Sequence, residues 1–201
     1  MKIAFALGSY LLGAVPSGYL LVRLRARRDI RSLGSGNTGA TNVLRIQGWK
    51  AALPVALFDV VKGALPPFLA LRLFHDERLA LIAALLAVLG HCYPVYIGFR
   101  GGKGVATTLG ALLIVGWWTP FAVALAVFAG TLALTRFVSL GSLLAALSVP
   151  VSSLVFNRGR AFAAWGLALF VLIAIRHREN IGRLLRGEER RLGRREGGQP
   201  S

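Results

Sequence analysis

Long apolar stretches recur along almost the whole chain and restrict the folds open to it. Hydrophobic residues make up 55% of the 201 residues, more than a globular domain of this size can hide from water. A helix of about 20 apolar residues crosses a bilayer, and several of the stretches approach that length. They predict an all-α integral membrane protein with seven transmembrane helices, at Ile3–Val22, Ala51–Phe74, Leu79–Ile97, Val105–Trp117, Pro120–Thr135, Val138–Phe156 and Ala161–Ile175.

Arginine clusters at the ends of these stretches predict the orientation of the chain. Five arginines lie between Arg23 and Arg31, and the positive-inside rule places them in the cytoplasm. A cleaved signal peptide would leave them outside, so the first stretch is interpreted as a retained helix. The short fourth and fifth stretches, which meet at residues 117–120, are interpreted as two tilted crossings rather than one re-entrant pair. The N-terminus is then outside and the C-terminus cytoplasmic.

The formal net charge of +16 points to anionic partners. The basic residues lie mostly at membrane edges and form no separate basic domain, so lipid headgroups and anionic substrates explain them better than nucleic acid. The sequence predicts one membrane domain, residues 1–189, followed by a basic, disordered cytoplasmic tail, residues 190–201. The single cysteine, Cys92, excludes an intramolecular disulfide, and neither a metal ion nor another cofactor is expected.

The first polar loop, residues 32–45, is rich in glycine and in small hydrogen-bonding side chains. Its glycines let the backbone turn and approach a ligand closely, and its small polar side chains are Ser35, Asn37, Thr38, Thr41 and Asn42. Such a loop suits an anion. The alternative is an uncharged turn that caps a helix at Thr41 or Asn42. Arg45 follows near headgroup depth.

The second polar loop surrounds Lys103 with Gly101, Gly102 and Gly104 and leads directly into an apolar helix. The N-terminal amides of that helix point at the loop, a geometry that suits phosphate. The loop is not a Walker P-loop, because Ile97 stands where the first glycine should be and a glycine follows the lysine. Nucleotide hydrolysis is therefore poorly supported.

Two further polar clusters fall on the same predicted face of the membrane. Ser139 and Ser142 begin the sixth stretch, where they either cap its helix or send a hydroxyl into an anion site. His177 and Asn180 follow the seventh stretch and, if helical, point the same way at i,i+3 spacing. The four clusters together predict a single cytoplasmic anion site.

Asp59 and Lys62 lie three residues apart inside the second stretch. Ionisable groups within a span usually face the protein interior and are candidate functional groups, but at i,i+3 spacing they can also neutralise each other. A supporting role behind the site is the preferred interpretation, and a direct chemical role stays open.

The chain lacks the usual catalytic sets, among them a Gly-x-Ser-x-Gly elbow, a His-Glu-x-x-His helix and a cysteine nucleophile with a paired histidine. What remains is a pair of phosphate-binding sites, built from amides, hydroxyls, Lys103 and Arg45, that face a hydrocarbon-lined bundle. This combination suits the transfer of a lipid-like group between phosphorylated molecules.

Three of these segments together resemble the cytoplasmic motifs of the bacterial acyl-phosphate:glycerol-3-phosphate acyltransferases. The segments are Ser35-Gly-Asn-Thr-Gly-Ala-Thr-Asn42, Gly98-Phe-Arg-Gly-Gly-Lys-Gly-Val-Ala-Thr107 and His177-Arg-Glu-Asn-Ile181. The resemblance runs to about Glu188 and includes the seven-span plan. It implies an enzyme of the bacterial cytoplasmic membrane with its active site on the cytoplasmic side. The implied reaction moves a fatty acyl group from acyl phosphate to the sn-1 hydroxyl of glycerol 3-phosphate, gives lysophosphatidate and inorganic phosphate, and begins phospholipid synthesis.

The resemblance also implies roles for individual residues. The acyl phosphate would be held by Ser35, Gly36, Asn37, Thr41 and the amides around Gly101 and Gly102. Glycerol 3-phosphate would be held by Arg45, Lys103, Ser142, His177 and Asn180. The candidate catalytic residues are Ser35, Lys103, His177 and Asn180, supported from behind by Asn42, Asp59 and Lys62. The proton acceptor is either the donor's own phosphate or His177 as a general base.

Functions of another class stay open on these observations. The main alternative is a small membrane transporter of an anionic metabolite, with Asp59 and Lys62 in its pathway. A carrier should show a midplane site in two related halves, whereas the polar clusters gather at one face. A non-catalytic lipid-binding protein is a weaker alternative. The expected partners are acyl phosphate, glycerol 3-phosphate and membrane lipids, and the protein is expected to be a monomer.

Overall fold

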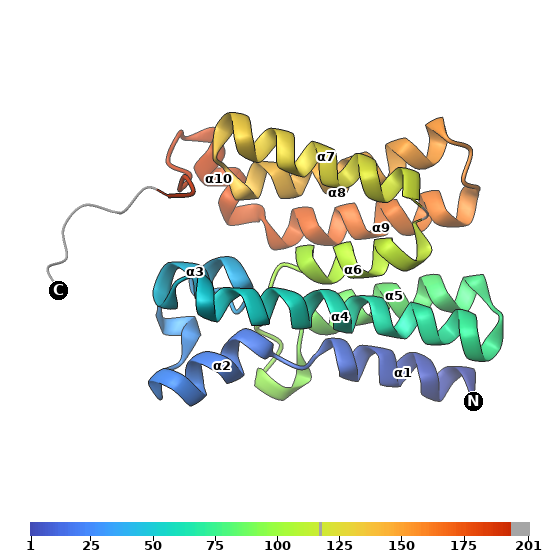
Figure 1. Cartoon of the computed structure of the whole chain (residues 1–201), viewed down its shortest axis with the longest axis horizontal. Coiled ribbons are helices and arrows are strands. Elements are labelled where there is room, and N and C mark those ends of the chain that lie inside the picture. The colour runs from blue at the N-terminus through green and yellow to red at the C-terminus, as the bar shows by residue number, and fades with distance from the viewer. Residues whose placement is uncertain (117, 194–201) are drawn as a thin grey trace, which may run out of the picture.

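The computed structural model describes residues 1–116 and 118–193. Within them, helices are the only regular secondary structure (Figure 1). Most of the helices run along the long axis of the molecule as a bundle. The α-helices are α1 (Lys2–Gly13), α2 (Ser17–Ala26), α3 (Ala40–Gln47), α4 (Trp49–Phe74), α5 (Glu77–Cys92), α6 (Val105–Val115), α7 (Trp118–Thr135), α8 (Val138–Val155), α9 (Arg160–Arg176) and α10 (Arg178–Leu185). Two short 3₁₀ helices, η1 (Ile30–Ser32) and η2 (Val95–Ile97), lie in the loops.

The bundle has two halves. Helices α1 to α5 form one half and α7 to α10 the other, with α6 between them (Figure 1). The core where the halves meet is built from buried side chains of α5, α6, α8 and α9, including Val88, Leu112, Val149 and Trp165. The site loops therefore sit at one end of a continuous apolar core.

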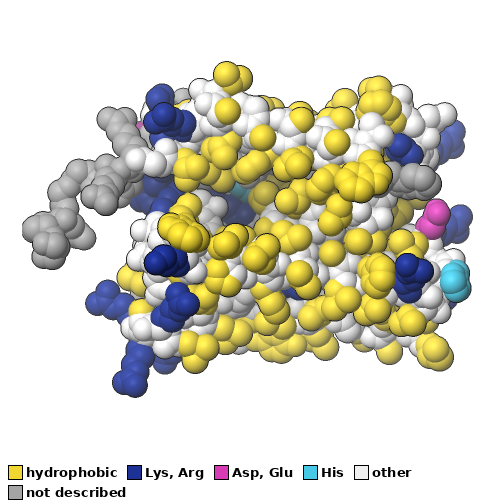
Figure 2. All heavy atoms as spheres, viewed as in Figure 1, with side chains coloured by type: hydrophobic (Ala, Val, Ile, Leu, Met, Phe, Trp, Pro, Cys, Tyr) yellow, Lys and Arg dark blue, Asp and Glu magenta, His cyan; other side chains and the backbone are white. Residues whose placement is uncertain are grey.

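The surface of the bundle is that of a membrane protein. Large apolar side chains such as Leu57, Leu134 and Leu154 are exposed. On the face that Figure 2 shows, apolar side chains cover the middle while lysine and arginine gather mostly at the ends. Among the described residues, five helical segments are long and apolar enough to cross a bilayer, and there are six if the bent pair α9–α10 is one span. The expected integral membrane, all-α class is confirmed.

Helix α6 is shorter than the expected fourth crossing. It ends at Val115 after 11 residues, about 16 Å at 1.5 Å per residue, and a bilayer core is about 30 Å thick. Trp117, the last residue of the predicted stretch, lies outside the described residues. Helix α7 then begins at Trp118, two residues before the predicted Pro120.

The predicted first helix is broken in two. Pro16 separates α1 from α2, because proline lacks the amide hydrogen of a helical residue and disfavours helical geometry at the residue before it. At the break, the carbonyl of Val15 accepts hydrogen bonds from the Ser17 amide at 3.1 Å and from Lys62 at 2.8 Å. The residues before α4 are also helical, since α3 runs from Ala40 to Gln47.

Close packing between α4 and α6 places the second polar loop near the first. A Cβ at Gly63 would collide with the carbonyl of Thr107, and a Cβ at Gly110 would collide with that of Val60. The two backbones are therefore in direct contact. Since α3 leads directly into α4, and α6 follows the loop around Lys103, this contact brings the first two polar loops to the same end of the bundle.

Candidate active site

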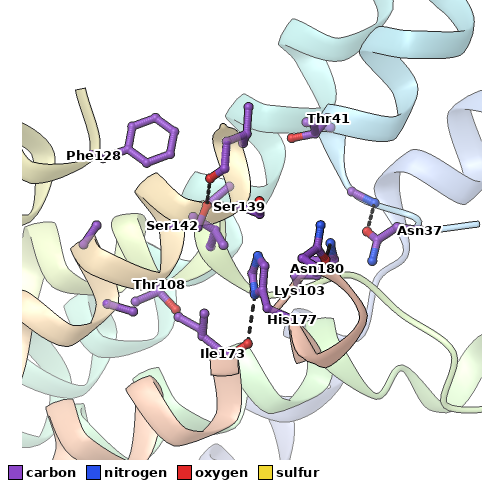
Figure 3. A pocket seen from close by; sticks show the side chains of 18 of the residues that line it. Asn37, Thr41, Lys103, Thr108, Phe128, Ser139, Ser142, Ile173, His177 and Asn180 are labelled. Atoms are coloured by element: carbon purple, nitrogen blue, oxygen red, sulfur yellow. Dashed lines mark hydrogen bonds between the residues drawn. The ribbon is translucent and has the colours of Figure 1, made fainter. Parts of the chain in front are cut away.

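A cavity of about 490 Å³ opens at the end of the bundle where the polar loops meet. Its inner wall is apolar, with Leu109, Leu125, Phe128 and Val149, and its outer wall is polar. In Figure 3, Lys103, Asn180 and His177 lie close together, with Ser139 and Ser142 on one side. The predicted site residues that line this cavity are Ser35, Asn37, Thr41, Asn42, Arg45, Asp59, Lys103, Ser142, His177 and Asn180.

The first polar loop is folded around the side chain of Asn42, which is almost fully buried. Its Oδ1 accepts a hydrogen bond from the amide of Ser35 at 2.9 Å, and its Nδ2 donates to the carbonyls of Leu33 and Asn37 at 3.0 and 2.9 Å. The loop can close this tightly because Gly34 and Gly36 adopt positive φ angles of 59° and 69°. Asn42 thus presents Ser35 and Asn37 to the cavity.

The alternative interpretation of this loop, a turn that caps a helix at Thr41 or Asn42, is wrong. Helix α3 begins at Ala40, and its N-cap, Gly39, has no side chain with which to cap it. Asn37 instead accepts a hydrogen bond from the Gly39 amide at 2.9 Å. Both candidate caps lie inside the helix, where their side chains are turned to the cavity or the loop.

The second polar loop directs its first two amides away from the cavity. Gly101 donates to the carbonyl of Cys92 at 3.3 Å, and Gly102 donates to that of His91 at 3.0 Å. Neither glycine lines the cavity, whereas the next four residues, 103–106, do. In this structure the first-turn amides of α6, which lack intrahelical acceptors, are therefore better placed for a phosphate than the Gly101 and Gly102 amides. The expected phosphate contact at these two glycines stays a prediction.

The Lys103 amine belongs to a polar network with the C-terminal segment. Lys103 donates to Oδ1 of Asn180, whose Nδ2 donates to Glu189 at 2.7 Å. The same carboxylate accepts from Ser139 at 2.8 Å and from Arg183 at 2.9 Å. Sequence reasoning missed Glu189 as a site residue, because nothing local distinguishes it from the exposed Glu188 beside it.

The C-terminal segment stays in contact with the bundle beyond the predicted domain boundary at residue 189. The amide of Leu192 donates to the carbonyl of Arg136 at 2.8 Å, and the Arg191 guanidinium lies 5.2 Å from the centre of the Phe137 ring. The tail expected to be disordered from residue 190 thus begins with residues that contact the bundle, and the domain boundary at 189 stays a prediction. The part of the tail from residue 194 onward lies outside the described residues.

Burial shapes the charges of this network. It lowers the pKa of the Lys103 amine to about 8, a shift that the Glu189 carboxylate opposes and that Arg183 and Arg45 increase. Burial would raise the pKa of Glu189, but the hydrogen bonds from Asn180, Ser139 and Arg183 outweigh it and hold the pKa below the usual glutamate value. At neutral pH the site therefore holds a positive Lys103 beside a negative Glu189.

His177 follows the last residue of α9 and is held in one tautomer. Its Nδ1 lies 2.8 Å from the carbonyl of Ile173 (Figure 3), and because a carbonyl only accepts, Nδ1 carries the hydrogen and Nε2 the lone pair. Burial, with the charge of Lys103, lowers the pKa of His177 to about 4. The ring is therefore neutral at physiological pH and offers an acceptor.

The two serines of α8 line the cavity without capping their helix. Ser142 donates to the carbonyl of Val138 at 2.8 Å, one turn earlier, while Ser139 binds Glu189. The capping interpretation is therefore wrong for both. Ser142 nevertheless has its oxygen at the cavity wall, where it can accept a hydrogen bond from a ligand.

The expected pairing of Asp59 with Lys62 is present at 2.8 Å, with both side chains buried. Asp59 also accepts from Ser17 at 2.7 Å, and Nδ1 of His91 lies 3.5 Å away. Asp59 lies at the cavity wall and Lys62 does not. The geometry matches a support behind the site, and the role of the pair remains a prediction.

Comparison with known proteins identifies the family. Residues 3–187 match the sequence family described as "Glycerol-3-phosphate acyltransferase". Proteins of this name from Syntrophotalea carbinolica and Thioalkalivibrio sulfidiphilus are 44% and 47% identical to the chain, over 92% and 94% of it and over 95% and 93% of their own lengths.

Solved structures agree with this match. The crystal structure of PlsY (YgiH), an integral membrane glycerol 3-phosphate acyltransferase, in its glycerol 3-phosphate form has a TM-score of 0.90 at 38% identity and covers 96% of both chains. The lysophosphatidic acid form has a TM-score of 0.87 at 36% identity and covers 96% of this chain and 95% of that one. The chain therefore belongs to the glycerol-3-phosphate acyltransferase family of integral membrane enzymes.

Proposed function

We propose that the cavity transfers a fatty acyl group from an acyl phosphate to the sn-1 hydroxyl of glycerol 3-phosphate. Family membership supplies the acyl transfer to glycerol 3-phosphate, and the donor is our inference. One observation carries it: the polar wall around Lys103 and the α6 N-terminus continues directly into an apolar wall. Such a cavity accepts a phosphate group and an attached hydrocarbon chain together. The transporter alternative is not favoured, because the relatives are enzymes.

Glycerol 3-phosphate binds at the side of the cavity formed by the α9–α10 break and the loop around Lys103. Its phosphate is bound by the charges of Lys103 and Arg45 and by the side chains of Ser142, His177 and Asn180. The lowered pKa of Lys103 leaves it mostly charged at neutral pH, so it can pair with a dianion. The relative of known structure has been obtained in a form named for this substrate.

The acyl phosphate binds on the facing side. Its phosphate is held by Ser35, Asn37 and Thr41 and by the first amides of α6, with Asn42 keeping the loop in shape. Gly36, also expected here, does not line the cavity, and its amide already donates to the carbonyl of Leu33 at 2.9 Å. The acyl chain then runs along Leu109, Leu125, Phe128 and Val149, which line the inner wall. Two phosphate groups side by side repel each other, and the cations at the cavity offset this repulsion.

The chemistry needs little from the protein because an acyl phosphate is an activated mixed anhydride. The hydroxyl oxygen attacks the carbonyl carbon, the bond from that carbon to the phosphate oxygen breaks, and phosphate leaves. The proton passes to the departing phosphate. A phosphate with a second pKa near 6 is a stronger base than the His177 ring, whose pKa is about 4. Alignment and charge stabilisation supply the rate enhancement.

We also propose the membrane arrangement that the charges predict. The chain crosses the membrane seven times. Helices α1 and α2 form one bent crossing, and the short α6 forms a crossing together with the loop backbone next to it. An odd number of crossings with a cytoplasmic C-terminus puts the N-terminus outside. The cavity opens to the cytoplasm of a bacterial inner membrane, beside the arginines that follow α2 and α9. Residues 1–189 act as one catalytic domain and the protein works as a monomer.

The test is phosphate release by the purified protein in detergent or lipid mesophase. Palmitoyl phosphate is supplied with and without glycerol 3-phosphate, and palmitoyl-coenzyme A serves as the rival donor. We expect release that needs glycerol 3-phosphate, yields lysophosphatidate and disappears in Lys103→Ala. Turnover with the thioester and none with palmitoyl phosphate would show that the donor assignment is wrong.

A further inference from the structure

Arg176, the last residue of α9, is a cation beside the site that the proposed reaction does not use. Its Nη2 donates to the carbonyl of Gly101 at 2.8 Å, and its Nε donates to that of Gly102 at 3.0 Å. The guanidinium also lies 5.1 Å from the centre of the Tyr93 ring. One planar group thus binds two consecutive carbonyls, which the fork of donors in arginine allows and the single ammonium of lysine does not match.

The same two glycines are held on their other side by the end of α5. Their amides donate to the carbonyls of Cys92 and His91 at 3.3 and 3.0 Å. A Cβ on Gly102 would collide with the His91 ring, so the backbone lies directly against it. The residues before Lys103 are therefore fixed by α5 through their amides and by α9 through their carbonyls.

This arrangement determines what the cavity presents to an anion. With both carbonyls bound to Arg176, their negative ends point away from the cavity, while Lys103 and the first turn of α6 point into it. Asn180 lies four residues after Arg176, beyond the break between α9 and α10, and its Oδ1 accepts a hydrogen bond from the Lys103 amine. The junction of α9 and α10 thus holds both the backbone before Lys103 and the amine at the end of its side chain.

We propose that Arg176 is a positioning residue, which acts through the Gly101–Gly102 backbone to hold Lys103 in place for the phosphate of glycerol 3-phosphate. The proposal rests on the assignment of glycerol 3-phosphate to this side of the cavity. Without the guanidinium, the two carbonyls lose their partners and the loop before Lys103 changes its orientation. The main effect should therefore be a lower affinity for glycerol 3-phosphate. Displacement of a binding group by about 1 Å can cost up to about 100-fold.

The experiment compares Arg176→Ala and Arg176→Lys with the control Arg178→Ala, which removes an exposed arginine two residues away. The Kd for glycerol 3-phosphate is measured by titration calorimetry on purified protein, without any acyl donor. The kcat and KM are then measured with palmitoyl phosphate. We expect Arg176→Ala to raise Kd and KM about 10- to 100-fold with a smaller change in kcat, Arg176→Lys to recover less than half of the loss, and Arg178→Ala to stay within about twofold.

A rescue experiment separates positioning from general folding. Guanidinium at non-denaturing, millimolar concentration should lower the KM of Arg176→Ala, and the same concentration of sodium chloride should not. A Kd within twofold of wild type in Arg176→Ala, or full recovery in Arg176→Lys, would overturn the proposal, because the fork would then be dispensable. If Arg176→Ala does not fold, Arg176→Lys decides by the same Kd criterion. Wild-type protein that binds glycerol 3-phosphate but does not turn over palmitoyl phosphate would count against the donor assignment alone.

Discussion

The lowered pKa of Lys103 makes the pH dependence of the enzyme a direct test of the proposed site. With a pKa of about 8, Lys103 is about 90% charged at pH 7 and about 10% charged at pH 9. Phosphate binding requires the charged form of Lys103. The affinity for glycerol 3-phosphate is therefore highest below this pKa and falls as the pH rises through it. An exposed lysine with the ordinary pKa near 10.4 would remain almost fully charged over the same range.

We therefore expect kcat/KM for glycerol 3-phosphate to fall about tenfold between pH 7 and pH 9, since kcat/KM reports the ionisation of the free enzyme. The assay follows lysophosphatidate formation from palmitoyl phosphate at saturating donor, with spontaneous donor hydrolysis subtracted at each pH. The matched control is Lys103→Arg, which has a lower rate but stays charged, and whose profile should be flat to pH 10. A flat wild-type profile to pH 9, or a fall of equal size in Lys103→Arg, would refute the reasoning.

Three further predictions concern groups around the cavity. Glu189→Gln removes the negative charge that raises the pKa of Lys103, so the alkaline limb of kcat/KM should move to lower pH; an unmoved limb would contradict the network. Asn42→Ala leaves one amide and two carbonyls without their partner. It should therefore lower the free energy of unfolding by at least about 2 kcal/mol and the Tm by about 4–8 °C. A decrease in Tm below 2 °C would show that the loop keeps its conformation without Asn42. Asp59→Asn leaves the Lys62 ammonium buried without a counter-charge, so it should destabilise the protein by about 3–5 kcal/mol; the double variant Asp59→Asn, Lys62→Met should recover part of this in the same melting assay.

The apolar spans were predictable because their signal is local and strong. The stretch Val138–Phe156 appears as the helix Val138–Val155, and Ala161–Ile175 lies within Arg160–Arg176. Most side chains of the polar loops reach the cavity for a related reason, since the crossings bring alternate loops to one face. Length alone could not show that α6 stops short, because an apolar run does not reveal where its helix ends.

The differences at the site concern groups whose role depends on distant partners. The glycines of the second loop indicated a phosphate-binding turn, but the direction of the Gly101 and Gly102 amides depends on carbonyls of α5 that no local pattern announces. Glu189 lies in a segment rich in arginine and glutamate. What places it at the cavity includes a hydrogen bond from Ser139, 50 residues earlier. Proline breaks helices, but the contact between the Val15 carbonyl and Lys62 that accompanies Pro16 requires the fold.

The break at Pro16 also bears on the order in which the bundle assembles. In lipid there is no water to complete the hydrogen bonding of the Val15 carbonyl or of the Lys62 ammonium. Ser17 and Asp59 supply one partner each, and the bond between Val15 and Lys62 adds a second. We therefore expect the α1–α2 segment to pack stably only once α4 has entered the membrane and turned its charged side inward. The kink would then tie packing of the N-terminal segment to correct insertion of the helix that carries Asp59.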